Sequence, residues 1–245
     1  GVAPTAWPAI DYAPMPGLSP ITIPAQTVCL GLEADPLAYA AHMLHVFRLA
    51  RPALADDGVA WLNLGDCYAQ DSKWGGASGA KNYTSAAGGI SRERKRTGLK
   101  DKDLMIIPAR VALALQADGW YVRNQAIWWK PNAMPESVKD RLTVDYEPMY
   151  LLTKSPRYYF DAAAIAEPAI KGAAGSRFDA GKTGTNGMGR VSTAPRVERE
   201  TRNRRTVWRI PTEALRDEHY APMPEALVEP CILAGSAVGD TVLDP

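Results

Sequence analysis

The chain has 245 residues, of which 46% are hydrophobic and 22% are charged, and its formal net charge is +1. This composition can bury the core of one large or two small domains, and it excludes a disordered acidic chain and a histone-like polycation. No run of about 18 apolar residues predicts a membrane span, and the first residues lack the pattern of a secretory signal. The three scattered cysteines (Cys29, Cys67 and Cys231) indicate a reducing, cytoplasmic setting.

The elements are predicted in chain order from hydrophobic spacing and turn residues. Residues 1–34 are rich in proline and have no hydrophobic period, so we expect an irregular lead-in. Asp35 before Pro36 predicts the first turn of a helix that ends before Gly58. The apolar run 59–65 is typical of a buried strand. The remaining pattern predicts a helix at 104–115, strands at 121–129, 146–153, 206–210 and 241–243, an edge strand or turn at 157–160, and a helix near 224–235.

Helices and strands alternate over short gaps, which predicts an α/β fold with a mostly parallel sheet. We divide the chain into an irregular lead-in, a first core part, a basic loop and a second core part, at 1–34, 35–170, 171–205 and 206–245. The chain starts without Met and ends just after the apolar strand predicted at 241–243. We therefore interpret it as a fragment.

Positive charge is concentrated in two segments rich in Gly, Ser and Thr. Residues 171–209 hold ten Lys/Arg and three Asp/Glu, and residues 91–102 hold six and two. Clustered cations release counterions when they bind a polyanion, and this release favours binding. The two segments therefore indicate contacts with phosphates, as in a nucleic acid. A solvated loop that only aids solubility is the alternative. We expect residues 172–203 to be disordered without DNA, because they bury too little to offset their ordering entropy.

Two other motifs are weaker. The segment 175–183 resembles a Walker A loop, but five residues separate its glycines where four are required, and no strand precedes it. Nucleotide hydrolysis is therefore disfavoured. His42 and His45 have the i, i+3 spacing of two metal ligands, but a third ligand is missing. We interpret both as ordinary helix-surface residues and expect no metal site.

Polar and aromatic residues follow two of the predicted strands. Asn63, Asp66 and Tyr68 come at the carboxyl end of the strand at 59–65, where open α/β sheets place ligands. Residues 128–137 leave the strand at 121–129 in the same way. For each segment, a strand cap with core aromatics is the alternative interpretation.

A series of sequence blocks, taken in order, resembles the permuted, β-class DNA amino-methyltransferases. The blocks are 62–68, 102–110, 118–123, 128–141, 150–161, 206–212, 219–227 and 242–245. The resemblance covers about 30–168 and 203–245. That family has a (Ser/Asp/Asn)-Pro-Pro-(Tyr/Trp/Phe) catalytic motif, which is absent here, and a cofactor strand Val-Leu-Asp-Pro-Phe, which here breaks off at Pro245. The resemblance therefore implies a fragment that lacks the catalytic motif and most of the cofactor loop.

The resemblance implies a Rossmann-like fold with a basic loop insertion, and transfer of a methyl group from S-adenosylmethionine to double-stranded DNA. The acceptor is the exocyclic amine of a flipped base, with N4 of cytosine slightly favoured over N6 of adenine. A non-catalytic DNA-binding protein of the same fold is the main alternative, and a small-molecule methyltransferase is disfavoured by the basic loop. The resemblance also implies a bacterial or phage-encoded cytoplasmic protein with a cognate restriction endonuclease as a partner. The fragment alone is expected to be inactive.

The resemblance also assigns residues to three groups of contacts, while the group that polarises the target amine would lie upstream of Gly1. Those lining the target-base pocket are Asn63, Asp66 and Tyr68. Those binding the cofactor are His219, Ala221, Pro222, Met223 and Asp244. Those contacting DNA are Lys130, Arg190, Arg196, Arg199, Arg202, Arg204 and Arg205.

Overall fold

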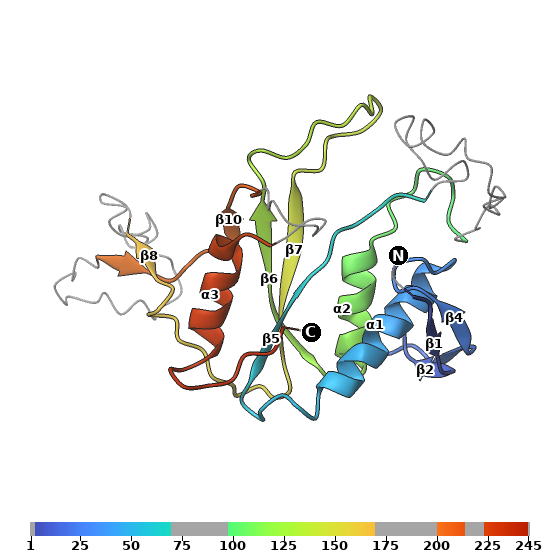
Figure 1. Ribbon diagram of the computed structural model, residues 1–245, viewed down its shortest axis with the longest axis horizontal. Coiled ribbons are helices and arrows are strands. Elements are labelled where there is room, and N and C mark those ends of the chain that lie inside the picture. The colour runs from blue at the N-terminus through green and yellow to red at the C-terminus, as the bar shows by residue number, and fades with distance from the viewer. Residues whose placement is uncertain (1–2, 70–97, 170–199, 214–222, 245) are drawn as a thin grey trace, which may run out of the picture.

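The computed structural model describes residues 3–69, 98–169, 200–213 and 223–244 (Figure 1). Three helices lie within these ranges: α1 (Pro36–Ala50), α2 (Ile107–Ala117) and α3 (Glu225–Gly235). The strands there are β1 (Thr5–Trp7), β2 (Ile10–Tyr12), β3 (Ile21–Ile23), β4 (Gln26–Val28), β5 (Val59–Asn63), β6 (Tyr121–Trp129), β7 (Tyr146–Thr153), β8 (Glu167–Pro168), β9 (Thr201–Arg202) and β10 (Val207–Arg209). The Walker-like segment and most of 172–203 lie outside the described residues, so the expected disorder stays a prediction.

The central sheet of the described residues has four strands in the order β10-β6-β7-β5. β10 pairs with β6 in parallel, whereas β7 is antiparallel to both of its neighbours, β5 and β6. The predicted mostly parallel pairing is therefore wrong: β5, β6 and β10 run in one direction, but β7 lies between two of them and runs the other way. The connection explains the difference. Residues 130–145 contain no helix, and parallel neighbours need a crossover, which is usually helical.

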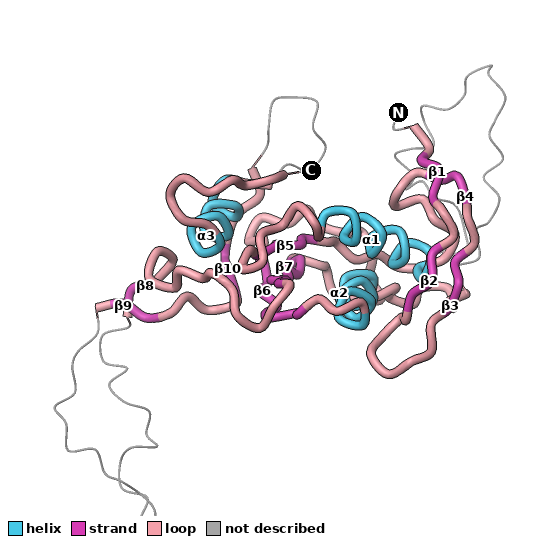
Figure 2. The backbone as a smooth tube through the Cα atoms, turned by 90° about the horizontal axis from the view of Figure 1, so that it is seen from below, coloured by secondary structure: helices cyan, strands magenta, loops and turns pink. Residues whose placement is uncertain are grey.

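The molecule has three layers. α1 and α2 cover one face of the sheet and α3 covers the other (Figures 1 and 2). Side chains of β7 alternate between the faces, so that Tyr150 and Leu152 join the core with α1 and α2, and Met149 joins the core with α3. All six residues from Pro148 to Thr153 are buried. β7 is therefore covered on both faces and belongs to both cores.

Four short strands replace the irregular lead-in expected at 1–34, so that prediction is wrong. β1 pairs with β4 and β2 with β3, all antiparallel, which makes one hairpin with a break in each arm. Pro8 separates β1 from β2, and Pro24 separates β3 from β4. Proline cannot donate to a strand ladder and is confined to such breaks. Each strand has three residues, too few for an alternating pattern to be recognised.

The N-terminal hairpin packs on α1 and buries one of its histidines. The Trp7 ring stacks on the His42 ring, with 4.3 Å between ring centres. His42 Nδ1 lies 2.7 Å from Glu33 Oε1, and the two side chains are 0% and 2% exposed. His42 is therefore a core residue and not the helix-surface residue that its spacing from His45 predicted. The N-terminal hairpin covers His42, and the sequence interpretation missed this hairpin.

The ends of the predicted elements differ from the structure at three places. α1 begins as expected, with Asp35 Oδ1 accepting a hydrogen bond from Leu37 N at 2.8 Å, but it ends at Ala50 because the nearby Pro52 has no N–H with which to continue it. Residues 157–160 form neither the predicted edge strand nor a turn: Arg157 lies in a bend, and residues 158–160 have no regular structure. Residues 241–243 are no strand either, because no described strand pairs with them and Val242 and Leu243 are 54% and 70% exposed.

α3 lies close against β5 at Gly235. A Cβ atom added there would lie 2.4 Å from Val59 Cγ2, so we expect Gly235→Ala to lower the free energy of unfolding by about 1–3 kcal/mol through overpacking. Urea denaturation measures the loss. In the Val59→Ala background the same glycine substitution should cost little, because the clashing methyl group is gone. An equal cost in both backgrounds would contradict this packing.

Tyr12 gives the fold a dependence on alkaline pH. Its hydroxyl donates to Leu37 O at 2.8 Å, and burial, followed by the nearby Asp35 carboxylate, raises the pKa of Tyr12 to about 12. Above the ordinary tyrosine pKa of about 10, the unfolded chain releases a proton that the folded chain keeps, so the free energy of unfolding falls as pH rises from about 10 to about 12.

The free energy of unfolding of the wild type should fall by on the order of 2 kcal/mol across that pH interval, and we expect Tyr12→Phe to remove this fall. Denaturation midpoints of the wild type and the variant at several alkaline pH values measure the difference. Both proteins should have the same pH dependence between neutral pH and about 9, where the phenol is protonated in either state. Parallel curves above pH 10 would show that Tyr12 does not carry the effect.

Candidate functional site

The carboxyl ends of β5, β6 and β10 lie at one edge of the sheet, because these strands run in the same direction (Figure 1). We call this edge, formed by residues 63–68, 129–147 and 209–212, the carboxyl edge. Trp128 Nε1 donates to Ile210 O at 2.8 Å. The Asn132 side chain exchanges two hydrogen bonds with the backbone of Thr212, at 2.8 and 3.0 Å. The segments that leave β6 and β10 are thus tied together where open α/β sheets place ligands.

Asp66 connects the end of β5 to the start of α2. Its Oδ1 accepts hydrogen bonds from the backbone N–H groups of Cys67 at 2.8 Å and Ile107 at 3.0 Å. Ile107 is the first residue of α2, and the next residue, Pro108, has no N–H to satisfy. A carboxylate at a helix N-terminus also interacts favourably with the helix dipole. Asp66 therefore positions α2, a role that the sequence prediction did not include.

The other two predicted pocket residues also lie at the carboxyl edge. Asn63 Nδ2 donates to Pro148 O at 3.2 Å, which ties β5 to β7. Tyr68 is half-buried, and the Arg141 guanidinium lies over its ring, 4.0 Å from the ring centre. The structure therefore brings Asn63, Asp66 and Tyr68 to the same edge, each anchored by a contact within the protein.

Tyr150 on β7 is a core residue next to this edge that sequence reasoning missed. It pairs in register with Leu62 on β5 and is 5% exposed. Burial, then the Asp66 carboxylate and then Tyr146, raise the pKa of Tyr150 above its ordinary value. Its hydroxyl therefore stays protonated at neutral pH. The register of the β5–β7 pair places Tyr150 beside the end of β5. The sequence could therefore point to Tyr150 only if this pairing were already known.

Glu147 on β7 is a second missed residue, and it holds Lys130. The two side chains form an ion pair, and Lys130 Nζ also lies 4.3 Å from the centre of the Trp128 ring. A Cβ atom added at Gly65 would lie 3.7 Å from Glu147 Oε1, so this ion pair sits directly beside the end of β5. The predicted DNA-contact residue Lys130 is thus part of the carboxyl edge.

The described arginines of the predicted DNA-contact set lie away from this edge, around the β8–β9 pair. Arg202 Nε and Arg205 Nε lie 2.8 and 2.6 Å from Glu167 Oε1. The Arg204 guanidinium lies 5.0 Å from the centre of the Trp208 ring. These residues hold the short β8–β9 pair against β10. The other predicted arginines, Arg190, Arg196 and Arg199, lie outside the described residues.

Only part of the predicted cofactor set is described. Met223 is 50% exposed and lies just before α3, and Asp244 is exposed in the segment after it. His219, Ala221 and Pro222 lie outside the described residues. The two described members therefore flank α3 in the chain and are accessible to a ligand.

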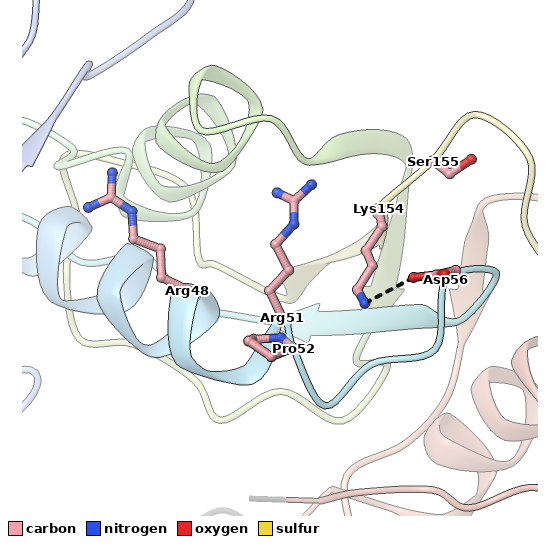
Figure 3. Close-up of a pocket in the computed structure, with 6 residues that line it drawn as sticks. All are labelled: Arg48, Arg51, Pro52, Asp56, Lys154 and Ser155. Carbon is pink, nitrogen blue, oxygen red and sulfur yellow. Dashed lines mark ion pairs between the residues drawn. The ribbon is translucent and has the colours of Figure 1, made fainter.

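A hollow of about 480 Å³ lies at the opposite edge of the sheet, where β5 begins and β7 ends (Figure 3). It is lined by Arg48, Arg51, Pro52, Asp56, Lys154 and Ser155. Its cations have partners within the protein: Arg48 pairs with Asp118 at 2.6 Å, and Lys154 lies 3.6 Å from Asp56. The predicted site residues do not line it. We therefore place the candidate site at the carboxyl edge and not in this hollow.

Two kinds of feature are absent from the part of the chain that the structure describes. No group of three or more His, Cys, Asp or Glu side chains there could hold a metal ion. No helix in the same ranges is both long and apolar enough to cross a membrane.

Comparison with known proteins places this arrangement in a family. Residues 30–245 match the N6/N4 DNA methylases, and the chain belongs to this family. The family implies a Rossmann-like, S-adenosylmethionine-dependent methyltransferase fold, to which the mixed sheet and the three helices contribute.

Among its relatives, the type II methyltransferase M.Cfr9I of Citrobacter freundii is 39% identical over 216 residues, which are 88% of this chain and 62% of that protein. M.SmaI of Serratia marcescens is also 39% identical over 216 residues, 88% of this chain and 65% of the relative. M.SfiI of Streptomyces fimbriatus is 49% identical over 140 residues, 57% of this chain and 30% of the relative. The chain thus spans less than two thirds of the length of these relatives.

The two bonds of Asp66 lead to a local stability prediction. Asp66→Ala removes the acceptor for Ile107 N, so we expect a loss of about 0.5–2 kcal/mol in the free energy of unfolding and faster hydrogen exchange at the first turn of α2. Asp35→Ala is the matched control, because Asp35 caps α1 in the same way and its loss should affect the first turn of α1 instead. Unchanged exchange at Ile107 in Asp66→Ala would rule out the capping role.

Proposed function

We propose that this chain is part of a site-specific DNA methyltransferase that moves a methyl group from S-adenosylmethionine to an exocyclic amine of a base. The match of residues 30–245 to the N6/N4 DNA methylases carries the proposal, and the names of the relatives as type II methyltransferases support it. We favour N4 of cytosine slightly over N6 of adenine, because residues 62–66 resemble the cytosine-specific members. The amine of a paired base is inaccessible, so the base has to leave the duplex.

The carboxyl edge offers groups suited to a flipped base. Such bases are held by stacking on aromatic rings and by hydrogen bonds to their Watson–Crick edge. Arg141 covers one face of the Tyr68 ring, so a base would stack on the other face. Asp66 Oδ1 is used by backbone N–H groups, while Oδ2 accepts no hydrogen bond from a described residue and is suited to an amine. Asn63 would lie beside them at the strand end.

The described cofactor residues fit S-adenosylmethionine by their chemistry. Asp244 is exposed in the block that resembles the family's cofactor strand, and its carboxylate can accept hydrogen bonds from the cofactor. Met223 is exposed beside α3, and its thioether is suited to packing against an aromatic base. When bound, the cofactor supplies an activated methyl group. The protein's own residues bind and orient the two reactants and exclude water from them.

We assign contacts with the DNA backbone to the basic residues of the predicted DNA-contact set. Lys130, Arg202, Arg204 and Arg205 each have a partner within the protein. A lysine has three N–H donors and an arginine has five, so each of them can contact a phosphate while it keeps that partner. For the arginines of the basic loop, the proposal includes two alternative roles: contact with phosphates only, or reading of base edges as well. By analogy with type II systems, a cognate restriction endonuclease is the proposed partner of the whole protein.

The proposal is tested with protein expressed from the complete reading frame that contains this chain. Labelled methyl transfer from S-adenosylmethionine to unmethylated DNA is measured, and the modified base is identified by nucleoside mass spectrometry. We expect N4-methylcytosine or N6-methyladenine. Asp66→Asn should lower kcat/KM by about tenfold or more if Asp66 contacts the base, whereas Asp35→Asn, at the cap of α1, should leave kcat/KM within about twofold.

The non-catalytic alternative predicts a different result from the same assay. That protein would bind DNA with a strong salt dependence and would transfer no methyl group. Salt-dependent binding of the full-length protein without incorporation of label would therefore replace our proposal with this alternative. Incorporation into any group other than an exocyclic amine would contradict the proposed reaction.

A further inference from the structure

The loop between β6 and β7, residues 130–145, projects beyond the carboxyl edge as two arms (Figure 1). We call it the edge loop. Lys130 N donates to Asp145 O at 2.7 Å and joins the arms at their base. An ion pair between Arg141 and Glu136 joins them again near the tip. Between these two links, each arm carries one aliphatic side chain that is almost fully exposed, and Val144 on the second arm is exposed to a lesser extent.

The two almost fully exposed side chains are Met134 and Leu142, which are 86% and 89% exposed. A single exposed aliphatic residue is ordinary on a protein surface. Here, however, two of them lie on facing arms of one loop, between the same pair of cross-links. The edge loop therefore presents them together.

The ionic side chains of the edge loop are largely used within the protein. The ion pairs are Lys130 with Glu147, Arg141 with Glu136, and Asp140 with Lys102. Paired charges of this kind contribute little to stability, and their effect here is to fix the position of the loop. Between its two cross-links the edge loop thus offers a partner apolar surface and not a cluster of free cations.

The ion pairs and ring contacts also set where this apolar surface lies. Arg141 lies over the Tyr68 ring at 4.0 Å, and Lys102 Nζ lies 2.7 Å from Asp140 Oδ2. These contacts hold the edge loop against the segment that carries Asp66 and Tyr68. The loop that carries Met134 and Leu142 is therefore fixed next to Tyr68, where the target base is proposed to stack.

We propose that Met134 and Leu142 enter the base stack of the DNA next to the target base and occupy space that the flipped base leaves. This inference rests on the proposed function. Proteins insert leucine and methionine side chains between base steps and thereby partially unstack them. Extruding a base costs pairing and stacking energy, and that cost is lowest for a mismatched or unpaired base. An inserted pair of aliphatic side chains is therefore needed most when the target base is fully paired.

The test compares paired and unpaired targets, with protein from the complete reading frame and after the methylated base has been located. We expect the double variant M134A/L142A to lower kcat/KM on the paired duplex by about tenfold or more. The rise in fluorescence of 2-aminopurine placed beside the target, which reports unstacking without methyl transfer, should shrink as well. A duplex with the target base opposite an abasic site should restore kcat/KM to within about threefold of the wild type.

Leu49→Ala is the matched control, because Leu49 is 68% exposed on α1 and should change neither substrate. Two results overturn the inference while the proposed function stands. Full activity of the double variant on the paired duplex would show that the two side chains do not assist flipping. An equal loss on both duplexes would show that they act otherwise than by opening the stack. A wild-type protein that methylates no base would overturn the proposed function and this inference with it.

Discussion

The placement of β7 between β5 and β6 is the constraint on which the rest of the structure depends. This strand is buried on both faces and runs against its neighbours. Because β7 returns antiparallel to β6, the loop that joins them lies at the same edge as the carboxyl ends of β5, β6 and β10. One edge thus receives three strand ends and a projecting loop, while the hollow with Lys154 falls at the other edge. A parallel β7 would have needed a crossover on a face of the sheet and would have left the carboxyl edge without the edge loop.

Charge pairs at the carboxyl edge act mainly on geometry. Ion pairs near the surface contribute only about 0–1 kcal/mol to stability, so the pairs of Lys102, Lys130 and Arg141 add little to the overall fold. The pairs of Lys102 and Lys130 join segments that are distant in the sequence, however, and the ring contact of Arg141 brings the edge loop to Tyr68. Asp66 does the same for α2 through two hydrogen bonds from one oxygen. These contacts assemble the site by fixing the positions of its segments, and they add little to the stability of the fold.

Sequence reasoning identified the elements with strong local signals and missed those set by tertiary contacts. The capping residue Asp35 and the apolar runs of β5, β6 and β7 are local, and the structure confirms them. The grouping of Asn63, Asp66 and Tyr68 follows from their place at the end of β5, although this strand is only partly buried and not fully buried as predicted. The direction of β7 depends on the missing helix between 129 and 146, a signal that was present but not used. Glu147, Tyr150 and the burial of His42 depend on strand register and on the N-terminal hairpin, which no local pattern reveals.

The β8–β9 pair has a consequence for the length of the chain that it joins. Glu167 and Pro168 pair with Arg202 and Thr201, and Ala169 N donates to Glu200 O at 2.9 Å. The described residues on the two sides of 170–199 thus lie next to each other. In general, closing a loop on such a stem costs only about 0.6 kcal/mol more for each doubling of its length. A change in the number of residues between Ala169 and Glu200 should therefore cost little, and it would leave the sheet and its carboxyl edge in place.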